Sequence, residues 1–240
     1  MDIYRGLELN MDKKQVLSFV GGGGKTTAIF KLAGELKALG KKVLITTTTA
    51  IYKPRQEEYD YYFVGNYEED FCPKIGSITI LGRELKGGKL LGLSLTHVER
   101  IVHGDLFDFI LIEADGAKKR PIKAMGLHEP VVSKYSSRTF GIIGMDCLGE
   151  SIEHIVHRPK LFVGIVGKDI QEKVDEMDVV KIILHPMGLF KAAKGEKVLI
   201  LNKIDDYKKY NAALNIKAKL LDEGFSGNIV LADIKEGYFY

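Results

Sequence analysis

Four consecutive glycines followed by a lysine and two threonines are the residues of this chain best suited to chemistry. An apolar run at residues 16–20 precedes them and a helical pattern follows. Glycine has no Cβ, so its backbone can adopt positive φ and bring N–H groups close to an anion. The helix directs the positive end of its dipole to the same place. The segment predicts a loop that binds a nucleotide phosphate, with these residues as ligands: Gly21, Gly22, Gly23, Gly24, Lys25, Thr26 and Thr27.

The spacing of this loop departs from the usual phosphate-loop pattern. The pattern G-x-x-x-x-G-K-[ST] would need a glycine where Phe19 stands, whereas a shorter G-x-x-G-K-T begins at Gly21. The shorter form is similar to the phosphate loop of the Mur ligases. The alternative is a glycine-rich hairpin or linker that happens to precede Lys-Thr. The order of strand, glycines, Lys-Thr and amphipathic helix favours the phosphate loop.

Two carboxylates end an apolar run at residues 108–114. Glu113 and Asp115 are two residues apart, so their side chains should leave a strand on the same face. Carboxylate and hydroxyl oxygens suit Mg²⁺, and we expect Glu113 and Thr26 to hold it. Asp115 is expected to polarise water or a substrate hydroxyl, with Lys25 at the phosphates. The alternative, a turn at Asp115 and an edge charge at Glu113, would leave a costly unpaired carboxylate.

A second nucleotide motif follows the apolar run at residues 197–201. Asn202, Lys203 and Asp205 resemble the N-K-x-D motif that reads guanine in GTPases. An Asp carboxylate can accept hydrogen bonds from guanine N1–H and N2–H₂, a pair that adenine does not offer, while the Lys stem lies over the base. The alternative is that Asp205 caps the next helix. This motif favours GTP and the short phosphate loop favours ATP, so both remain open.

A threonine run and a basic run are further candidates. Residues 46–49 are all threonine, and Thr48 and Thr49 could meet Mg²⁺, the γ-phosphate or a water, although threonine also simply suits a strand. The basic run could grip an anionic substrate or the γ-phosphate, although such runs are often solvated faces. It consists of Lys118, Lys119 and Arg120.

Two histidines and an arginine lie close together before Pro159. His154, His157 and Arg158 have no cysteine or second histidine pair at ligand spacing, so a zinc site has little support. We therefore interpret them as contacts for a partner or a substrate.

The elements that must position these residues alternate between strands and helices. A strand at 16–20, a helix at 26–39 and a strand at 42–46 form a βαβ unit with parallel strands. Further strands are expected at 75–81, 108–114, 139–143, 197–201 and 228–232, helices at 94–102, 176–184 and 207–221, and an irregular segment at 50–70. In the last helix Tyr210, Leu214 and Leu221 are expected to face inward.

This pattern predicts an α/β fold of the P-loop NTPase type. Its three αβα layers would contain a mostly parallel central sheet with a small antiparallel hairpin at the edge, in which a turn at 83–88 joins the strand at 75–81 to one at 89–91. Residues 1–240 would form one domain with an irregular insert at about 50–93. Ligands of such sheets bind beyond the carboxyl ends of the strands, where the candidate residues lie.

Composition excludes several classes of protein. There are 35 basic and 32 acidic residues, a balance that gives no reason to expect nucleic acid or a membrane surface as partner. No apolar run approaches the roughly 20 residues of a membrane helix, and no signal-peptide pattern begins the chain. The chain has two cysteines, Cys72 and Cys147, and so could form at most one disulfide. So few cysteines in a chain of this length suggest a reducing compartment. We expect a cytoplasmic protein.

The motifs taken together resemble the YqeC family. They are the segments 19–27, 45–49, 113–123, 157–159 and 201–205, in that order over nearly the whole chain. Members of this family are described as accessory or cofactor-biosynthesis proteins for selenium-dependent molybdenum hydroxylases. The resemblance implies a P-loop NTPase fold, a role in maturing such an enzyme, and a molybdenum hydroxylase or its cofactor as partner. It carries over Lys25, Thr26, Glu113 and Asp115 by motif position.

Three functions are compatible with these observations. The first is an Mg²⁺-dependent NTPase that couples hydrolysis of GTP or ATP to cofactor loading. The second is a kinase, nucleotidyl transferase or Mur-like ligase, in which the basic run at 118–120 holds a small acceptor. The third is a nucleotide-gated carrier or scaffold with negligible turnover, switched by the 50–70 segment.

Overall fold

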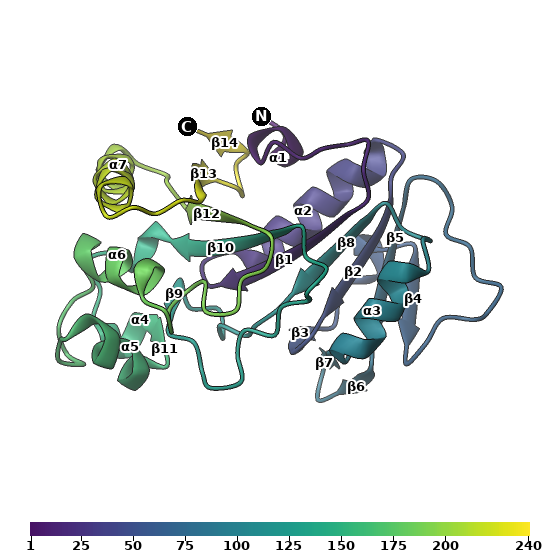
Figure 1. Ribbon diagram of the computed structural model, residues 1–240, viewed down its shortest axis with the longest axis horizontal. Helices are drawn as coiled ribbons and strands as arrows, with labels where there is room; N and C mark the ends of the chain where they lie inside the picture. The colour runs from purple at the N-terminus through teal and green to yellow at the C-terminus, as the bar shows by residue number, and fades with distance from the viewer.

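A nine-stranded sheet runs through the whole molecule in the computed structural model, which describes residues 1–240. Its strand order is β14-β13-β12-β10-β1-β8-β2-β5-β4 (Figure 1), and every neighbouring pair is parallel except β13 with β14. The strands are β1 (Gln15–Gly21), β2 (Lys42–Thr47), β4 (Tyr61–Val64), β5 (Ser77–Gly82), β8 (Phe109–Glu113), β10 (Arg138–Gly144), β12 (Glu196–Asn202), β13 (Asn228–Asp233) and β14 (Tyr238–Phe239).

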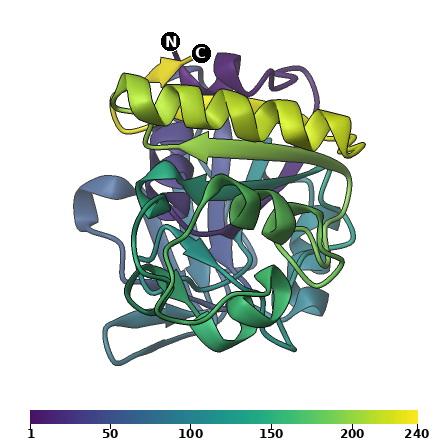
Figure 2. The ribbon, with the colours of Figure 1, turned by 90° about the vertical axis from the view of Figure 1, so that its left-hand side faces the viewer.

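Helices cover both faces of this sheet, and β1 shows how. Leu17 and Phe19 pack in one hydrophobic cluster with α2, whereas Val16 and Val20 face the opposite side. One face carries α1 (Ile3–Gly6) and α2 (Lys25–Ala38), and the other carries α3 (Leu95–His103), α5 (Pro159–Val166), α6 (Glu176–Leu184) and α7 (Tyr207–Asp222). Figure 2 shows α7 running alongside β12. The predicted three-layer α/β fold with a mostly parallel sheet is confirmed.

Two small sheets lie outside the central one. A small antiparallel sheet is present, but its strands are not the expected ones: β7 (Lys89–Leu91) pairs with β6 (Glu84–Lys86) and with β3 (Ala50–Tyr52). The expected partner of residues 89–91, the strand near 75–81, is β5, which is parallel to both of its neighbours in the central sheet. The second sheet pairs β9 (Ile122–Lys123) with β11 (Val156–His157), next to the short helix α4 (Ile152–Ile155). Two 3₁₀ turns are η1 (Gln56–Glu58) and η2 (Met145–Cys147).

The structure also differs from the expected elements at residues 50–70 and in the last helix, and it adds α5 and β14, which were not expected. The segment 50–70 contains β3 and β4, and β4 extends the central sheet as its last strand. Its run of Tyr, Tyr, Phe and Val is typical of strands, a signal hidden by the charged residues around it. In α7 Tyr210 packs against the hydrophobic core as expected, whereas Leu214 and Leu221 are exposed. The buried residues of this helix are Ala213, Ile216 and Leu220.

The carboxyl ends of the parallel strands meet at one edge of the sheet. There β1 runs into the glycines, β8 ends at Glu113 and β12 ends at Asn202. Parallel strands bring these separated segments together because all of them point the same way. None of the helices combines the length and apolar character needed to cross a membrane.

Candidate functional site

The glycine loop at the end of β1 has a shape that only glycine can adopt. Gly23 and Gly24 have φ of 73° and 128°, in the region that side chains rarely reach. A Cβ on Gly22 would lie 2.5 Å from the Arg120 carbonyl oxygen, and one on Gly23 would lie 2.1 Å from the Gly144 nitrogen. The glycines therefore allow two neighbouring segments to pack directly against the loop.

The backbone N–H groups of this loop divide into two sets. Three are engaged inside the protein: Gly21 donates to Asp115 Oδ2 at 3.0 Å, Gly22 to the Ile142 oxygen at 2.9 Å and Gly23 to the Arg120 oxygen at 3.0 Å. The next four, at residues 24–27, donate no hydrogen bond within the chain. These free donors stand at the N-terminus of α2, where the helix dipole favours an anion.

Lys25 is the first residue of α2, and its side chain turns back under the loop. Its Nζ lies 2.5 Å from the Gly21 oxygen, 3.0 Å from Asp115 Oδ1 and 4.0 Å from Glu113 Oε1. Burial acts to lower the pKa of Lys25, but the two carboxylates outweigh it and raise that pKa above its usual value. Lys25 is therefore a fixed positive charge beside the free amides.

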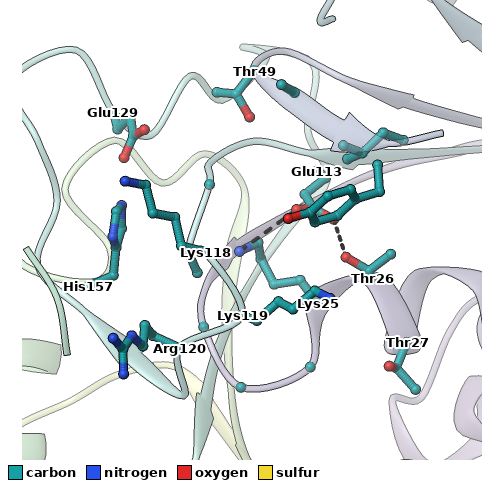
Figure 3. Close-up of a pocket in the computed structure, with 18 of the residues that line it drawn as sticks. Lys25, Thr26, Thr27, Thr49, Glu113, Lys118, Lys119, Arg120, Glu129 and His157 are labelled. Atoms are coloured by element: carbon teal, nitrogen blue, oxygen red, sulfur yellow. Dashed lines mark hydrogen bonds and ion pairs between the residues drawn. The ribbon is translucent and has the colours of Figure 1, made fainter. Parts of the chain in front are cut away.

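Glu113 and Thr26 meet directly, as the sequence led us to expect. Thr26 Oγ1 donates to Glu113 Oε2 at 2.9 Å (Figure 3). Burial raises the pKa of Glu113, while Lys25 and the Thr26 hydrogen bond oppose this. No three or more His, Cys, Asp or Glu side chains gather into a metal-binding group. The oxygens of Glu113 and Thr26 nevertheless fit a Mg²⁺ ion, because Mg²⁺ commonly takes one or two protein ligands and completes its coordination with phosphate and water oxygens.

Asp115 is completely buried and does not line the cavity at the loop. One oxygen forms the ion pair with Lys25 and the other accepts from Gly21 and pairs with Lys123 Nζ at 3.0 Å. With both oxygens engaged by the protein, Asp115 is placed to position Lys25 and the loop. The structure does not bring it to where a water or substrate hydroxyl would lie.

A chain of alternating charges continues from Asp115 through Lys123 and Glu129, which were not predicted from the sequence, to Arg158. Lys123 Nζ lies 2.7 Å from Glu129 Oε2, and Arg158 donates to the same oxygen. Burial acts to raise the pKa of Glu129, but hydrogen bonds from Arg158 and Lys123 lower it to about 2. A buried carboxylate needs a counterion. The several basic residues that follow Asp115 in the sequence were therefore the signal from which its pairing with Lys123 could have been predicted.

The glycine loop opens onto a cavity of about 1030 Å³ (Figure 3). Its lining includes the whole basic run, Lys118, Lys119 and Arg120, together with Thr49, His157 and Arg158. Thr48 is not part of the lining, because its hydroxyl donates to the Val131 oxygen at 2.7 Å. His154 also lies outside. Ile51, Tyr52 and Lys89 of the small antiparallel sheet line the cavity opposite the loop.

A second cavity of about 340 Å³ contains the Asn202–Asp205 segment. Gly24, Thr27 and Lys203 line both cavities. Asn202 joins the glycine loop to the C-terminal strand region, since its Nδ2 donates to the Gly23 oxygen at 2.8 Å and its Oδ1 accepts from the Ile234 N–H at 2.9 Å.

The residue that caps α7 is Asp206 and not Asp205. Asp206 Oδ1 accepts from the Lys209 N–H at 2.7 Å, whereas Asp205 lines the second cavity and pairs with the Lys209 side chain. The alternative in which Asp205 serves as the helix cap is therefore wrong. Lys203, whose φ is 64°, pairs with Asp146 Oδ2 at 2.6 Å.

Comparison with known proteins gives one family. The sequence profile described as YqeC protein matches residues 17–160. The chain is 33% identical over 189 residues to the uncharacterized protein YqeC of Escherichia coli strain K12, which covers 77% of this chain and 74% of that protein. No solved structure matches the chain.

Proposed function

The chain belongs to the YqeC family, and from the geometry of its two cavities we propose that it is an Mg²⁺-dependent nucleoside triphosphate-binding protein with NTPase activity. One observation carries the proposal. Four free amides at the start of α2 stand beside the Lys25 ammonium and the Thr26–Glu113 pair, all at the mouth of one large cavity. This combination supplies the positioning and the charge neutralisation on which phosphoryl transfer depends.

The residues have distinct tasks in this proposal. The N–H groups of residues 24–27 hold phosphate oxygens. Lys25 presents its ammonium to the β- and γ-phosphates, while the ion pair with Asp115 keeps it oriented. Glu113 and Thr26 hold Mg²⁺, which neutralises charge on the phosphates.

The base of the nucleotide would occupy the second cavity. Gly24 and Thr27 line both cavities, so a single ligand can extend from one to the other. Asp205 is free of a capping role and can accept two hydrogen bonds from guanine, with the stem of Lys203 beside the ring. We therefore propose GTP as the preferred nucleotide over ATP.

The biological role that we propose is maturation of a selenium-dependent molybdenum hydroxylase. This step rests on the family resemblance alone. The partner would be the hydroxylase or its cofactor, and nucleotide turnover would drive its loading or modification.

The test is a binding titration of the purified protein with GTP and with ATP, each with and without Mg²⁺. We expect GTP to bind more tightly, and Mg²⁺ to strengthen binding. Asp205→Asn should lose at least about tenfold in GTP affinity, because a charged hydrogen-bond acceptor contributes roughly 1.5–3 kcal/mol. Asp222→Asn, an exposed carboxylate near the end of α7, is the matched control.

Lys25→Ala separates the enzyme from other functions. This variant should lose GTP hydrolysis, since it removes the cation that the Asp115 ion pair holds beneath the glycine loop. Hydrolysis that survives in Lys25→Ala would count against the proposed enzyme. Tight binding without turnover in the wild type would instead favour a nucleotide-gated carrier.

A further inference from the structure

The large cavity offers more room than the triphosphate needs. At about 1030 Å³ it lies at the upper end of the roughly 300–1,000 Å³ typical for one small-molecule site. In the proposed arrangement the base lies in the other cavity, so only the triphosphate and Mg²⁺ enter this one. The part of the cavity furthest from α2 therefore stays open to a second ligand.

The lining of this cavity has a large excess of positive charge. Seven Lys or Arg residues line it against two Glu residues. Lys25, Arg158 and Lys203 have carboxylate partners within the protein. The other four, Lys89, Lys118, Lys119 and Arg120, form no ion pair and no side-chain hydrogen bond. Two of these, Lys89 and Lys119, have Nζ 5.3 and 5.1 Å from the centre of the Tyr52 ring.

Residues 118–120, which we call the cation loop, have a fixed position relative to the phosphate loop. The Gly23 N–H donates to the Arg120 oxygen at 3.0 Å, and the Gly144 N–H donates to the Pro121 oxygen at 2.9 Å. Lys118 and Lys119 both have positive φ, 48° and 62°, an unusual backbone for two successive lysines. In Figure 3 Lys118 lies between Lys25 and His157, Lys119 lies beside Lys25, and Arg120 lies below His157. The cations are thus held next to the place proposed for the γ-phosphate.

We propose that the cation loop and Lys89 form a second substrate site, which binds a small molecule bearing a phosphate or diphosphate group beside the γ-phosphate of the nucleotide. An arginine fork and several ammonium groups match phosphate oxygens. Four cations carry more positive charge than a ligand with a single carboxylate would need, which favours a phosphate or diphosphate. The proposal rests on the proposed nucleotide function, and it identifies the class of molecule on which the enzyme would act.

The test uses inorganic pyrophosphate as the probe and a fluorescent, non-hydrolysable GTP analogue with Mg²⁺ as the reporter. Calorimetry of the nucleotide-loaded wild type should show saturable binding of pyrophosphate while the fluorescent nucleotide stays bound. Lys118→Gln, Lys119→Gln and Arg120→Gln should each weaken pyrophosphate binding by about tenfold, because each removes a charged hydrogen-bond donor. Each should weaken pyrophosphate more than it weakens the nucleotide.

Lys86→Gln is the matched control, since Lys86 is an exposed lysine of β6 outside the cavity, and it should change neither ligand. Displacement of the nucleotide by pyrophosphate, or binding that ignores the three variants, would overturn the second site. Absence of any nucleotide binding would instead refute the proposed function. In that case the second site stands only if pyrophosphate binding to the free protein is lost in Lys119→Gln and kept in Lys25→Ala.

Discussion

Lys123 shows how much one buried charge can contribute to this site. Its side chain and that of Asp115 are both fully buried, and it also pairs with Glu129. Lys123→Ala would remove one of the two cations that each carboxylate has, leaving Asp115 with Lys25 alone and Glu129 with Arg158 alone. Removing one partner of a buried pair costs about 3–5 kcal/mol. Urea denaturation at pH 7 should show a loss of this size.

Lys219→Ala is the control for this prediction. Lys219 pairs with Glu176 at 3.5 Å, and both side chains are partly exposed. Surface ion pairs contribute about 0–1 kcal/mol, so the control should change stability little. Equal losses in the two variants would show that the buried charge chain does not stabilise the fold.

His157 should make the protein sensitive to acid. Burial, with the nearby charges of Lys123 and Arg158, lowers the pKa of His157 to about 4. Between pH 6.5 and 4 the unfolded chain therefore binds a proton at this residue that the folded chain does not, so stability falls as the pH falls. Because His157 is only partly buried, solvent screening makes this loss smaller than the displaced pKa alone would imply.

Urea midpoints measured at pH 7, 5.5 and 4 check this prediction. His157→Gln should lose less stability than the wild type between pH 6.5 and 4. Because the pKa of Glu129 is lowered to about 2, both proteins should also lose stability as the pH falls below the ordinary pKa of a glutamate. His154→Gln, which removes an exposed imidazole outside the cavity, should follow the wild-type curve. Parallel curves for all three proteins would contradict the role given to His157.

At the scale of the elements, the junction of β1 and α2 depends on glycine at some positions and not at others. Gly23→Ala would place a Cβ 2.1 Å from the Gly144 nitrogen at a φ of 73°. Gly34, within α2, has nothing within 4 Å of its Cβ position. We therefore expect Gly23→Ala to destabilise by at least about 1 kcal/mol and to lose nucleotide binding, and Gly34→Ala to stabilise by about 0.5–1 kcal/mol.

Thermal unfolding and nucleotide titration of the two variants measure both effects. Each variant adds one methyl group, so the two variants differ only in the surroundings of that methyl group and in the backbone conformation of the substituted residue. If Gly23→Ala folds and binds nucleotide as well as the wild type, the close packing of residues 120 and 144 against the loop is not required.

Over the whole molecule, the nucleotide should bind where three distant parts of the chain meet. The glycine loop contacts the cation loop through Arg120, and Asn202 joins it to Ile234. A ligand that binds only the folded chain stabilises it by about 2.7 kcal/mol at 100 times its Kd. We therefore expect Mg²⁺ and GTP together to raise the unfolding temperature in a concentration-dependent way.

Lys25→Ala is the control for this effect and should show no such shift. Hydrogen exchange adds a spatial check, since bound nucleotide should slow exchange at residues 24–27, where the amides are free in the ligand-free chain. A temperature shift that is the same in Lys25→Ala would place the nucleotide elsewhere.

The sequence by itself determined the features that depend on local backbone geometry. Apolar runs and helical periodicity predicted α6 and most central strands within one or two residues. The rule that parallel strands end at one edge predicted the meeting of Thr26 with Glu113, which lie 2.9 Å apart. Roles for these residues in binding Mg²⁺ or nucleotide stay predictions.

Only the tertiary structure decided what depends on contacts between distant residues. It placed Asp115 under the loop with Lys25 and Lys123, assigned the α7 cap to Asp206, and brought the cation loop against Gly23. Periodicity reports which face of an element is buried, but it does not report which of several charges will meet there. That choice is set by how segments about 100 residues apart pack together, and in this protein it determines the charges around the large cavity.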